Sequence, residues 1–206
     1  MWSSEVTNMI ITGIWETLYM TLVSTLVGYV IGLPMGIILT VSDKDGIKPN
    51  AVLYKILDVI ANIVRSVPFI ILLVLLIPFT RLVVGKSYGS TATIVPLVIA
   101  AAPYIARMVE SSLKEVDAGV IEAARSMGAS NFTIITKVML VEARTSLLVG
   151  ATITLGTILG YSAMSGAVGG GGLGAIEIRY GYTRWQTDIM IVTVILLIIL
   201  FQIFQT

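Results

Sequence analysis

Long apolar runs separated by short polar segments form the main pattern of this chain of 206 residues. The five longest runs lie at about 17–41, 57–79, 91–108, 146–168 and 189–206. An α-helix rises about 1.5 Å per residue, so about 20 apolar residues cross the roughly 30 Å hydrocarbon core of a membrane. The pattern predicts an all-α membrane protein with five transmembrane helices in one domain, residues 1–206, and a long polar loop at 109–145.

The composition supports a membrane protein independently of these runs. Apolar residues make up 56% of the chain and charged residues 12%, with a mean hydropathy of +0.96, whereas a soluble domain carries about 25% charged residues. The net charge of +1 gives no global field that would attract nucleic acid. Cysteine and histidine are both absent, which excludes disulfides, thiolate chemistry and histidine proton shuttles. We expect no catalytic residue, cofactor or metal in this chain.

The distribution of Lys and Arg predicts how the chain is oriented in the membrane. Eight of these residues lie in or beside the loops 42–56 and 109–145: Lys44, Lys48, Lys55, Arg107, Lys114, Arg125, Lys137 and Arg144. Four lie on the opposite side: Arg81, Lys86, Arg179 and Arg184. The excess places the 109–145 loop and the C-terminus in the cytoplasm and the N-terminus outside. The first run is too long, and its flank too poor in basic residues, for a cleavable signal peptide. The absence of a basic residue after the last run fits a chain that stops short of a natural basic tail.

Residues 121–140, IEAARSMGASNFTIITKVML, form the most informative polar segment. They predict a helix, a break and a second helix. Asp117 is placed to cap the first helix, and Gly128 to end it in a left-handed turn. Ser130 or Asn131 is placed to cap the second. A short exposed helix of this kind suits either a groove in another protein or a plain connector.

The spacing of small and charged residues in this segment follows a known signature. Glu122, Ala123 and Ala124 are followed by Gly128, and then by Val138 and Leu140. This spacing resembles the EAA signature of the permease subunits of bacterial ABC importers. Val141 departs from the pattern, because the family usually has proline there, and this leaves the start of the following helix open.

Three further stretches extend the resemblance to the permeases of methionine importers, from about Thr12 to the C-terminus. They are residues 65–70 (RSVPFI), 103–110 (PYIARMVE) and 160–174 (GYSAMSGAVGGGGLG). The resemblance implies a type I ABC importer transmembrane domain, a transport subunit rather than an enzyme, in the bacterial cytoplasmic (inner) membrane. It implies alternating-access transport of an amino acid, with methionine expected.

The resemblance also implies partners. The residues expected to dock on an ATPase are Glu122, Ala123, Ala124, Arg125 and Gly128. The assembly would hold a second copy of this chain, two ATP-binding cassette ATPase subunits that carry ATP and Mg, and an external substrate-binding protein. Membrane lipid would surround it, and no nucleic acid is expected.

Two polar stretches inside the apolar runs are candidates for a translocation pathway or gate. In the fourth run, Met164 stands between Ser162 and Ser165. A flexible thioether there suits a narrow hydrophobic gate at a two-fold axis, although ordinary packing is the more common role of a methionine.

The second run carries the other polar stretch. Arg65 shares one helical face with Asp58 and Asn62. Lining of an inward-facing cavity and a structural network at the cytoplasmic edge are equally good interpretations. Pro68 frees a backbone carbonyl and bends the helix, and the resemblance implies that it lies near the pathway.

Glycines form two further patterns. Gly28, Gly32 and Gly36 line one helical face, which favours close packing within the chain over a contact between two copies. Gly169, Gly171 and Gly174 satisfy a dinucleotide-binding pattern, but no strand precedes them and an apolar run follows. We expect a flexible external turn there. Gly85-Lys86-Ser87 lacks the earlier glycine of a P-loop, so the sequence offers no ATP-binding motif.

Two other classes of protein remain as alternatives. An ion- or proton-coupled secondary transporter of small polar solutes would need carboxylates within its spans, and Asp58 and Asp188 lie only at the edges. A membrane-embedded hydrolase would need a Ser-His or metal constellation, which the absence of histidine excludes. Association with an ATPase would separate the importer from the secondary transporter.

Overall fold

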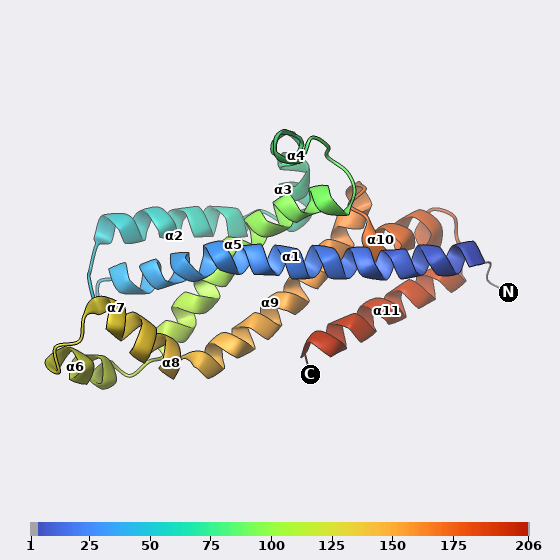
Figure 1. Cartoon of the computed structure of the whole chain (residues 1–206). Coiled ribbons are helices and arrows are strands. Elements are labelled where there is room, and N and C mark those ends of the chain that lie inside the picture. Colours follow the sequence, from blue (N-terminus) through green and yellow to red (C-terminus); the bar gives the residue numbers. More distant parts are fainter. Residues whose placement is uncertain (1–3, 206) are drawn as a thin grey trace. The chain divides into compact units, whose positions relative to one another are not determined.

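The computed structural model describes residues 4–205, and no strand occurs among them. Four helical stretches are long and apolar enough to cross a membrane: α1 (Ser4–Ser42), α5 (Ser90–Lys114), the stretch Arg144–Tyr182 that begins with α9 (Arg144–Ser165), and α11 (Thr187–Gln205) (Figure 1). A fifth span results if α2 (Ala51–Ser66) and α3 (Phe69–Leu75) are counted together. The predicted all-α membrane fold is confirmed.

The second apolar run is broken rather than continuous. The sequence predicts one span over 57–79, whereas the structure has α2, then α3, then α4 (Ile77–Val84). Proline lacks an N–H group and disfavours helical geometry in the residue before it, so α2 ends ahead of Val67 and Pro68. The Pro68 carbonyl accepts hydrogen bonds from the N–H groups of Ile71 and Leu72, at 2.9 and 3.0 Å, and so starts α3. The bend expected at this proline is therefore present.

The first helix is longer than its apolar run. It begins at Ser4 instead of Thr17 and continues through Pro34 to Ser42, a total of 39 residues. A helix of that length extends about 58 Å, well beyond the thickness of a hydrocarbon core. The polar ends of α1 therefore have to lie outside it.

The chain divides into two compact units. Unit 1 comprises Met1–Val27, Val67–Ala101 and Ile153–Thr206, and unit 2 comprises Gly28–Ser66 and Ala102–Thr152. The long helices α1, α5 and α9 each contribute residues to both. The remaining elements are α6 (Ala118–Ser126), α7 (Asn131–Thr133), η1 (Ile134–Met139), α8 (Leu140–Glu142), η2 (Gly166–Val168), α10 (Gly172–Ile176) and η3 (Glu177–Tyr182).

In unit 2, glycines bring α1 and α5 into close contact. A Cβ atom at Gly32 would lie 2.6 Å from the Ala102 carbonyl oxygen, and one at Gly36 would lie 2.6 Å from that of Ala106. The facing residues Ile105 and Val109 of α5 are almost completely buried. The interpretation of Gly32 and Gly36 as packing positions within the chain is confirmed.

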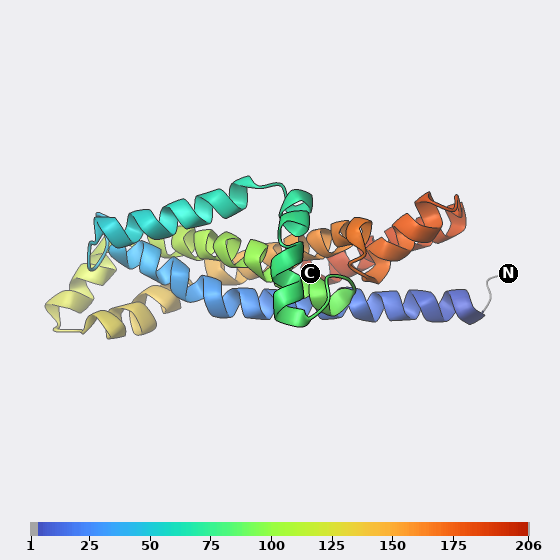
Figure 2. The same ribbon diagram turned by 90° about the horizontal axis from the view of Figure 1, so that it is seen from above.

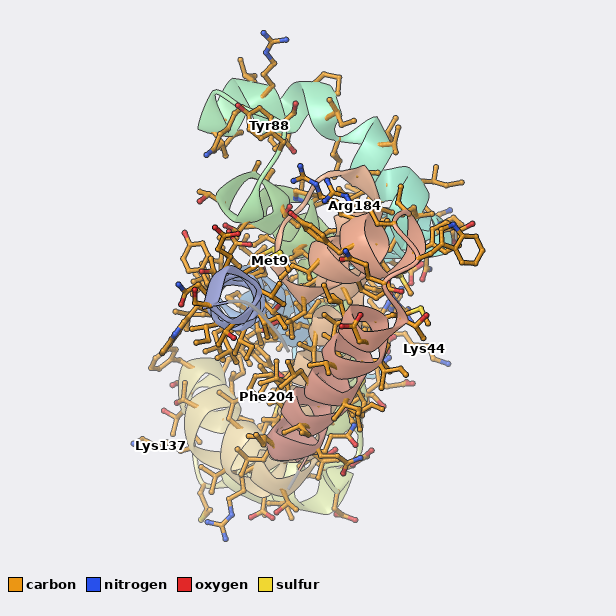
Figure 3. The ribbon with its side chains drawn as sticks, turned by 90° about the vertical axis from the view of Figure 1, so that its right-hand side faces the viewer. Met9, Lys44, Tyr88, Lys137, Arg184 and Phe204 are labelled. Atoms are coloured by element: carbon orange, nitrogen blue, oxygen red, sulfur yellow. The ribbon has the colours of Figure 1, made fainter. Side chains whose placement is uncertain are left out.

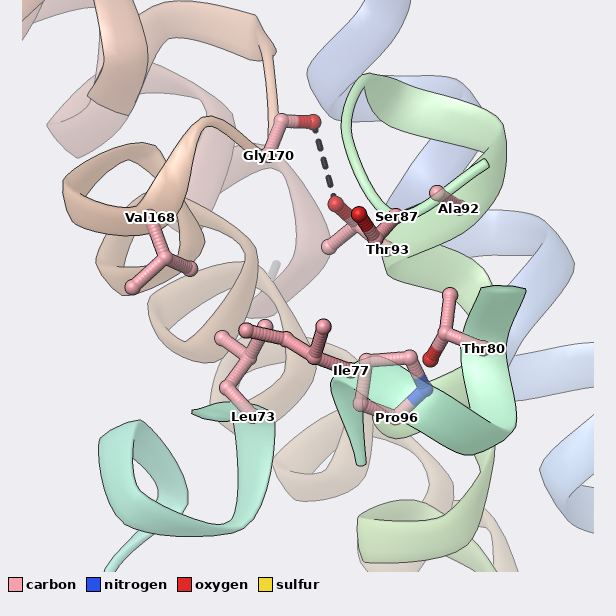
Figure 4. A pocket seen from close by; sticks show the side chains of 9 residues that line it. All are labelled: Leu73, Ile77, Thr80, Ser87, Ala92, Thr93, Pro96, Val168 and Gly170. Atoms are coloured by element: carbon pink, nitrogen blue, oxygen red, sulfur yellow. Dashed lines mark hydrogen bonds between the residues drawn. The ribbon is translucent and has the colours of Figure 1, made fainter. Parts of the chain in front are cut away.

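In unit 1, the glycine-rich turn at 169–172 is held by two helices. The Glu16 carboxylate accepts from the Gly172 N–H at 2.7 Å. Figure 4 shows the second bond, in which the Thr93 hydroxyl donates to the Gly170 carbonyl at 3.1 Å. The next backbone N–H, at Leu173, donates to Thr17 at 2.9 Å. The expectation of a flexible turn is wrong, because bonds from α1 and α5 fix it. The segment 169–188, which separates the fourth and fifth predicted runs, is also largely helical and contains α10 and η3.

Candidate functional site

The polar segment 121–140 folds as the predicted helix, break and helix. The Asp117 carboxylate accepts from the Gly119 N–H at 2.7 Å, which caps α6. Gly128 has a φ of +80°, a conformation that costs side-chain-bearing residues free energy. The N–H groups of Gly128 and Ala129 close the end of α6 onto the carbonyls of Arg125 and Ala124, at 2.9 and 3.1 Å. Both ends of α6 are thus fixed by local bonds.

We call α6 and the helical segment that follows it, α7, η1 and α8, the α6 hairpin. Its second arm comprises α7, η1 and α8. Ser130, one of the two predicted caps, accepts from the Thr133 N–H at 3.2 Å. The helical path continues beyond Val141 and is interrupted at Ala143, so α9 begins at Arg144. The residue in the place of the family's proline therefore lies within α8. Figure 3 shows Lys137 of η1 pointing away from the ribbon.

The hairpin buries one face of α6 and exposes the other. Ala124 is buried, as are Ile134 and Met139 of η1, which packs beside α6. Glu122, Ala123 and Arg125 are exposed. Of the two alanines expected to dock on an ATPase, Ala124 is therefore buried and Ala123 exposed.

Two large apolar side chains at the tip of the hairpin lack cover within the described chain. Met127 is 83% exposed and Phe132 is 76% exposed. Both lie in a polar segment that joins two apolar spans, where lipid contact does not account for their exposure. Exposed apolar side chains beside charged ones are typical of a surface that binds another protein.

A groove with a volume of about 740 Å³ is lined by residues of α6, of the end of α5 and of the turn that joins α1 to α2. Figure 2 shows α6 and this turn at the same end of the ribbon. Acidic and basic side chains line it: Asp43, Asp45, Glu122, Lys114 and Arg125. The Arg125 guanidinium crosses to the turn and donates to the Ile47 carbonyl at 3.2 Å. Arg125, predicted to dock on a partner, thus also holds α6 against its own chain.

Beside the groove, a chain of ion pairs joins α2, α5 and the turn after α1. Arg107 contacts Asp58 of α2 and lies 2.6 Å from Glu110. Glu110 lies 2.8 Å from Lys114, which in turn lies 2.6 Å from Asp43. The Lys114 ammonium that donates to Asp43 holds the pKa of that carboxyl group below its usual range. We call these five residues the ion-pair chain.

The ion-pair chain supports the structural interpretation for two residues of the polar face of α2. Asp58 and Asn62 both bond to Arg107 and so belong to a structural network. Arg65 is exposed and makes no ion pair within residues 4–205. The spacing of Arg107, Glu110 and Lys114 along one helix could have indicated part of this network from sequence. Asp43 and Asp58 could not have been assigned, because they come from other elements.

The predicted gate residues lie in different surroundings. The Ser162 and Ser165 hydroxyls are buried and donate to the carbonyls of Leu159 and Ser162, at 2.8 and 2.6 Å. Met164, between them, is 52% exposed. The hydroxyls of the two serines are therefore hydrogen-bonded within their own helix, while the Met164 side chain is exposed.

Aromatic stacking connects the second candidate stretch with α9. Pro68 is exposed at the start of α3. The next residue, Phe69, stacks on Tyr161 with ring centroids 4.4 Å apart. Within unit 1, the structure thus brings the Pro68 turn beside the helix that carries Met164. Arg65 belongs to unit 2.

Comparison with known proteins gives a consistent picture. The family model for the binding-protein-dependent transport system inner membrane component matches residues 28–206. The probable D-methionine transport system permease protein of Vibrio cholerae is 49% identical over 205 residues, which covers 100% of this chain and 91% of that protein. The D-methionine transport system permease protein of Escherichia coli strain K12 is 53% identical over 158 residues, covering 77% of this chain and 73% of that one.

A solved structure matches almost the whole fold. A chain of the MetNI methionine ABC transporter, in an inward-facing conformation, superposes with a TM-score of 0.97 at 51% identity. The match covers 99% of this chain and 94% of the other. An amino acid ABC transporter matches with a TM-score of 0.79 at 21% identity, which is a likeness of fold alone.

Proposed function

This chain belongs to the family of binding-protein-dependent transport system inner membrane components, and from that membership we propose that it carries methionine through the bacterial cytoplasmic membrane. It is the permease subunit of an ABC importer and not an enzyme. The observation that carries the substrate is the 49% and 53% identity to permeases named for D-methionine transport. The whole fold also matches a chain of a methionine ABC transporter.

The proposed docking site for the partner ATPase is α6 with its closing turn. Glu122, Ala123 and Arg125 are exposed, and Ala124 and Gly128 shape the helix and its end. A rigid element transmits force better than a mobile one, and both ends of α6 are capped. The exposed Met127 and Phe132 support a protein partner at this tip.

The remaining partners follow from this role. Two copies of the chain would form the pathway, two ATPase subunits would bind the ATP and Mg, and an external binding protein would deliver the amino acid. The N-terminus would lie outside, with the docking loop and the C-terminus in the cytoplasm. The excess of Lys and Arg in the loops 42–56 and 109–145 supports this orientation.

The movement that produces alternating access would start at the ATPase pair and reach the spans through α6. Closure of the ATP-loaded ATPase pair moves α6, the spans open outward, and hydrolysis restores the inward-facing state. Met164 would close the pathway as a hydrophobic gate where two copies meet. Its exposure at 52% in the single chain supports a contact outside this chain. Ser162, Ser165, Arg65 and Pro68 would support or border that pathway.

A secondary transporter is less well supported. Its coupling ion would need a carboxylate that is free to load and unload within the spans. Glu110 and Asp58 are instead held in ion pairs with Arg107. Their charges are already balanced by the protein.

Uptake into proteoliposomes tests the proposal. The chain is reconstituted with its ATPase and binding protein in sealed vesicles. Uptake of labelled methionine is followed with ATP inside and no ion gradient, and with a proton gradient and no ATP. We expect ATP-dependent accumulation of methionine, with little competition from glutamine or histidine. Transport of another amino acid in place of methionine would contradict the proposed substrate. Uptake that needs a proton gradient but no ATP would contradict an ATP-driven importer.

A further inference from the structure

The ion-pair chain, Asp43, Asp58, Arg107, Glu110 and Lys114, joins the elements on either side of the groove. We propose that it is the strut that passes the movement of α6 into α2, the helix that precedes the broken span. The inference rests on the proposed docking of an ATPase at α6. It assigns positioning roles to residues that touch neither the ATPase nor the substrate.

The strut is connected to α6 through the turn that follows α1. Arg125 of α6 donates to the Ile47 carbonyl at 3.2 Å. The turn itself is closed, because the N–H groups of Lys48 and Asn50 donate to the carbonyls of Val41 and Ser42, at 3.0 and 2.9 Å. A displacement of α6 is therefore transferred to the turn as a whole.

The turn leads directly into α2. The Asn50 side chain caps this helix by accepting from the Leu53 N–H at 3.1 Å. Lys114 of α5 holds the turn at Asp43, and Arg107 of α5 holds α2 at Asp58. Both ends of the segment are thus tied to the same face of α5.

Burial of Glu110 makes it costly to separate the charges at the middle of the strut. The Glu110 side chain is 5% exposed and lies between the Arg107 and Lys114 cations. The Tyr54 hydroxyl of α2 adds a hydrogen bond of 3.2 Å to the same carboxylate. Separating these groups would leave a buried charge without its partner, which is far more costly than moving them together. Turn, α2 and α5 therefore move as one body.

An exposed ion pair in the same turn supplies the contrast. Lys44 lies 3.7 Å from Asp45, and their side chains are 85% and 84% exposed. Such a pair is screened by water and contributes little to stability, and it joins two neighbouring residues rather than two elements. Lys44 also lies outside the lining of the groove. It is therefore a matched control for the loss of one charge.

The C-terminal end of α2 lies next to the break in the second span. This helix ends at Ser66, immediately before Val67 and Pro68 break the span. Movement of α2 is thus delivered to the backbone at the break. Arg65 and Pro68, both candidates for the pathway, lie at this position.

Spin labels can follow the two ends of the strut separately. The chain contains no cysteine, so Lys137→Cys of η1 and Lys55→Cys of α2 each introduce a single labelling position per copy. In the permease–ATPase complex in nanodiscs, the distance between the two copies' labels is measured without nucleotide and after trapping with ATP and vanadate. Both distances should change in the otherwise unaltered chain.

Glu110→Gln removes the central charge and nearly keeps the shape. We expect the nucleotide-dependent change at Lys137 to persist and that at Lys55 to be lost. ATP hydrolysed per methionine imported should rise by about 2- to 30-fold, the range over which residues in coupled networks alter coupling. Lys44→Gln should leave both readouts as they are.

Asp58→Asn provides a second test at the more exposed end of the strut, where misfolding is a smaller risk. We expect the same separation of the two distance changes, in a weaker form. Persistence of the Lys55 change together with an unaltered coupling ratio, in whichever of the two variants folds, would overturn the strut. Absence of any ATPase association or ATP-driven uptake in the unaltered chain would instead overturn the proposed function.

Discussion

Met164 of α9 is more exposed than the two serines that flank it. Its neighbours Ser162 and Ser165 are buried and bonded to their own helix, whereas its thioether is 52% exposed. A methionine that served only the core of this chain would be covered by it. Substitution of this residue therefore tests the proposed gate.

We predict that Met164→Ala increases leakage through the reconstituted permease severalfold in the absence of ATP, because a narrow apolar constriction holds back water and solute only while it stays closed. The measurement is the loss of labelled methionine from preloaded proteoliposomes. Leu148→Ala, at a position on the same helix that is 69% exposed, serves as the control. Equal leakage from both variants would contradict a gate at Met164 and leave it an ordinary packing residue.

Local chemistry made the caps of α6 predictable, because each depends on residues that are close in sequence. Asp117, Gly128 and Ser130 all take the expected positions. The ion pairs of Asp43 and Asp58 could not be predicted in the same way. Their partners, Lys114 and Arg107, are brought to them only by tertiary folding.

At the scale of elements, the contact between α1 and α5 depends on glycines that admit no side chain. A Cβ atom at Gly32 would lie 2.6 Å from the Ala102 carbonyl oxygen, closer than real Cβ contacts allow. At Gly160 of α9, by contrast, no neighbouring atom of residues 4–205 lies within 4 Å of the corresponding position. The two glycines form a natural pair for one substitution.

We predict that Gly32→Ala destabilises the permease by about 1–3 kcal/mol, the usual cost of overpacking. Gly160→Ala should be neutral or stabilising by up to about 1 kcal/mol, because alanine has the higher helix propensity. Thermal unfolding of both variants in detergent provides the comparison. A melting temperature for Gly32→Ala that matches or exceeds that of Gly160→Ala would contradict the packing of α1 on α5.

The long apolar helices were predictable as elements, since length and composition alone define them. The glycine-rich turn was not, because the bonds that fix it come from Glu16 and Thr93, far away in the sequence. The break at Val67 and Pro68 was visible as a bend. That it divides the predicted second span into separate helices required the structure.

The complete permease needs a point where an ATPase subunit attaches, and α6 is the proposed point. The chain offers no ATP-binding motif, so the energy for transport has to enter through a surface. The α6 hairpin combines fixed caps, outward charges and the exposed Met127 and Phe132. The family membership and the match to a methionine ABC transporter agree with that assignment.

The most direct measurement is co-purification of the permease with its tagged ATPase subunit. Glu122→Lys reverses a charge on the outward face of α6, and Gly128→Val strains its end at a φ of +80°. Glu115→Lys, an exposed charge reversal just ahead of α6, is the control. We predict that both α6 variants weaken association by about tenfold or more, as expected for a lost interface contact, while the control associates normally. Undiminished association of Glu122→Lys and Gly128→Val would contradict docking through α6.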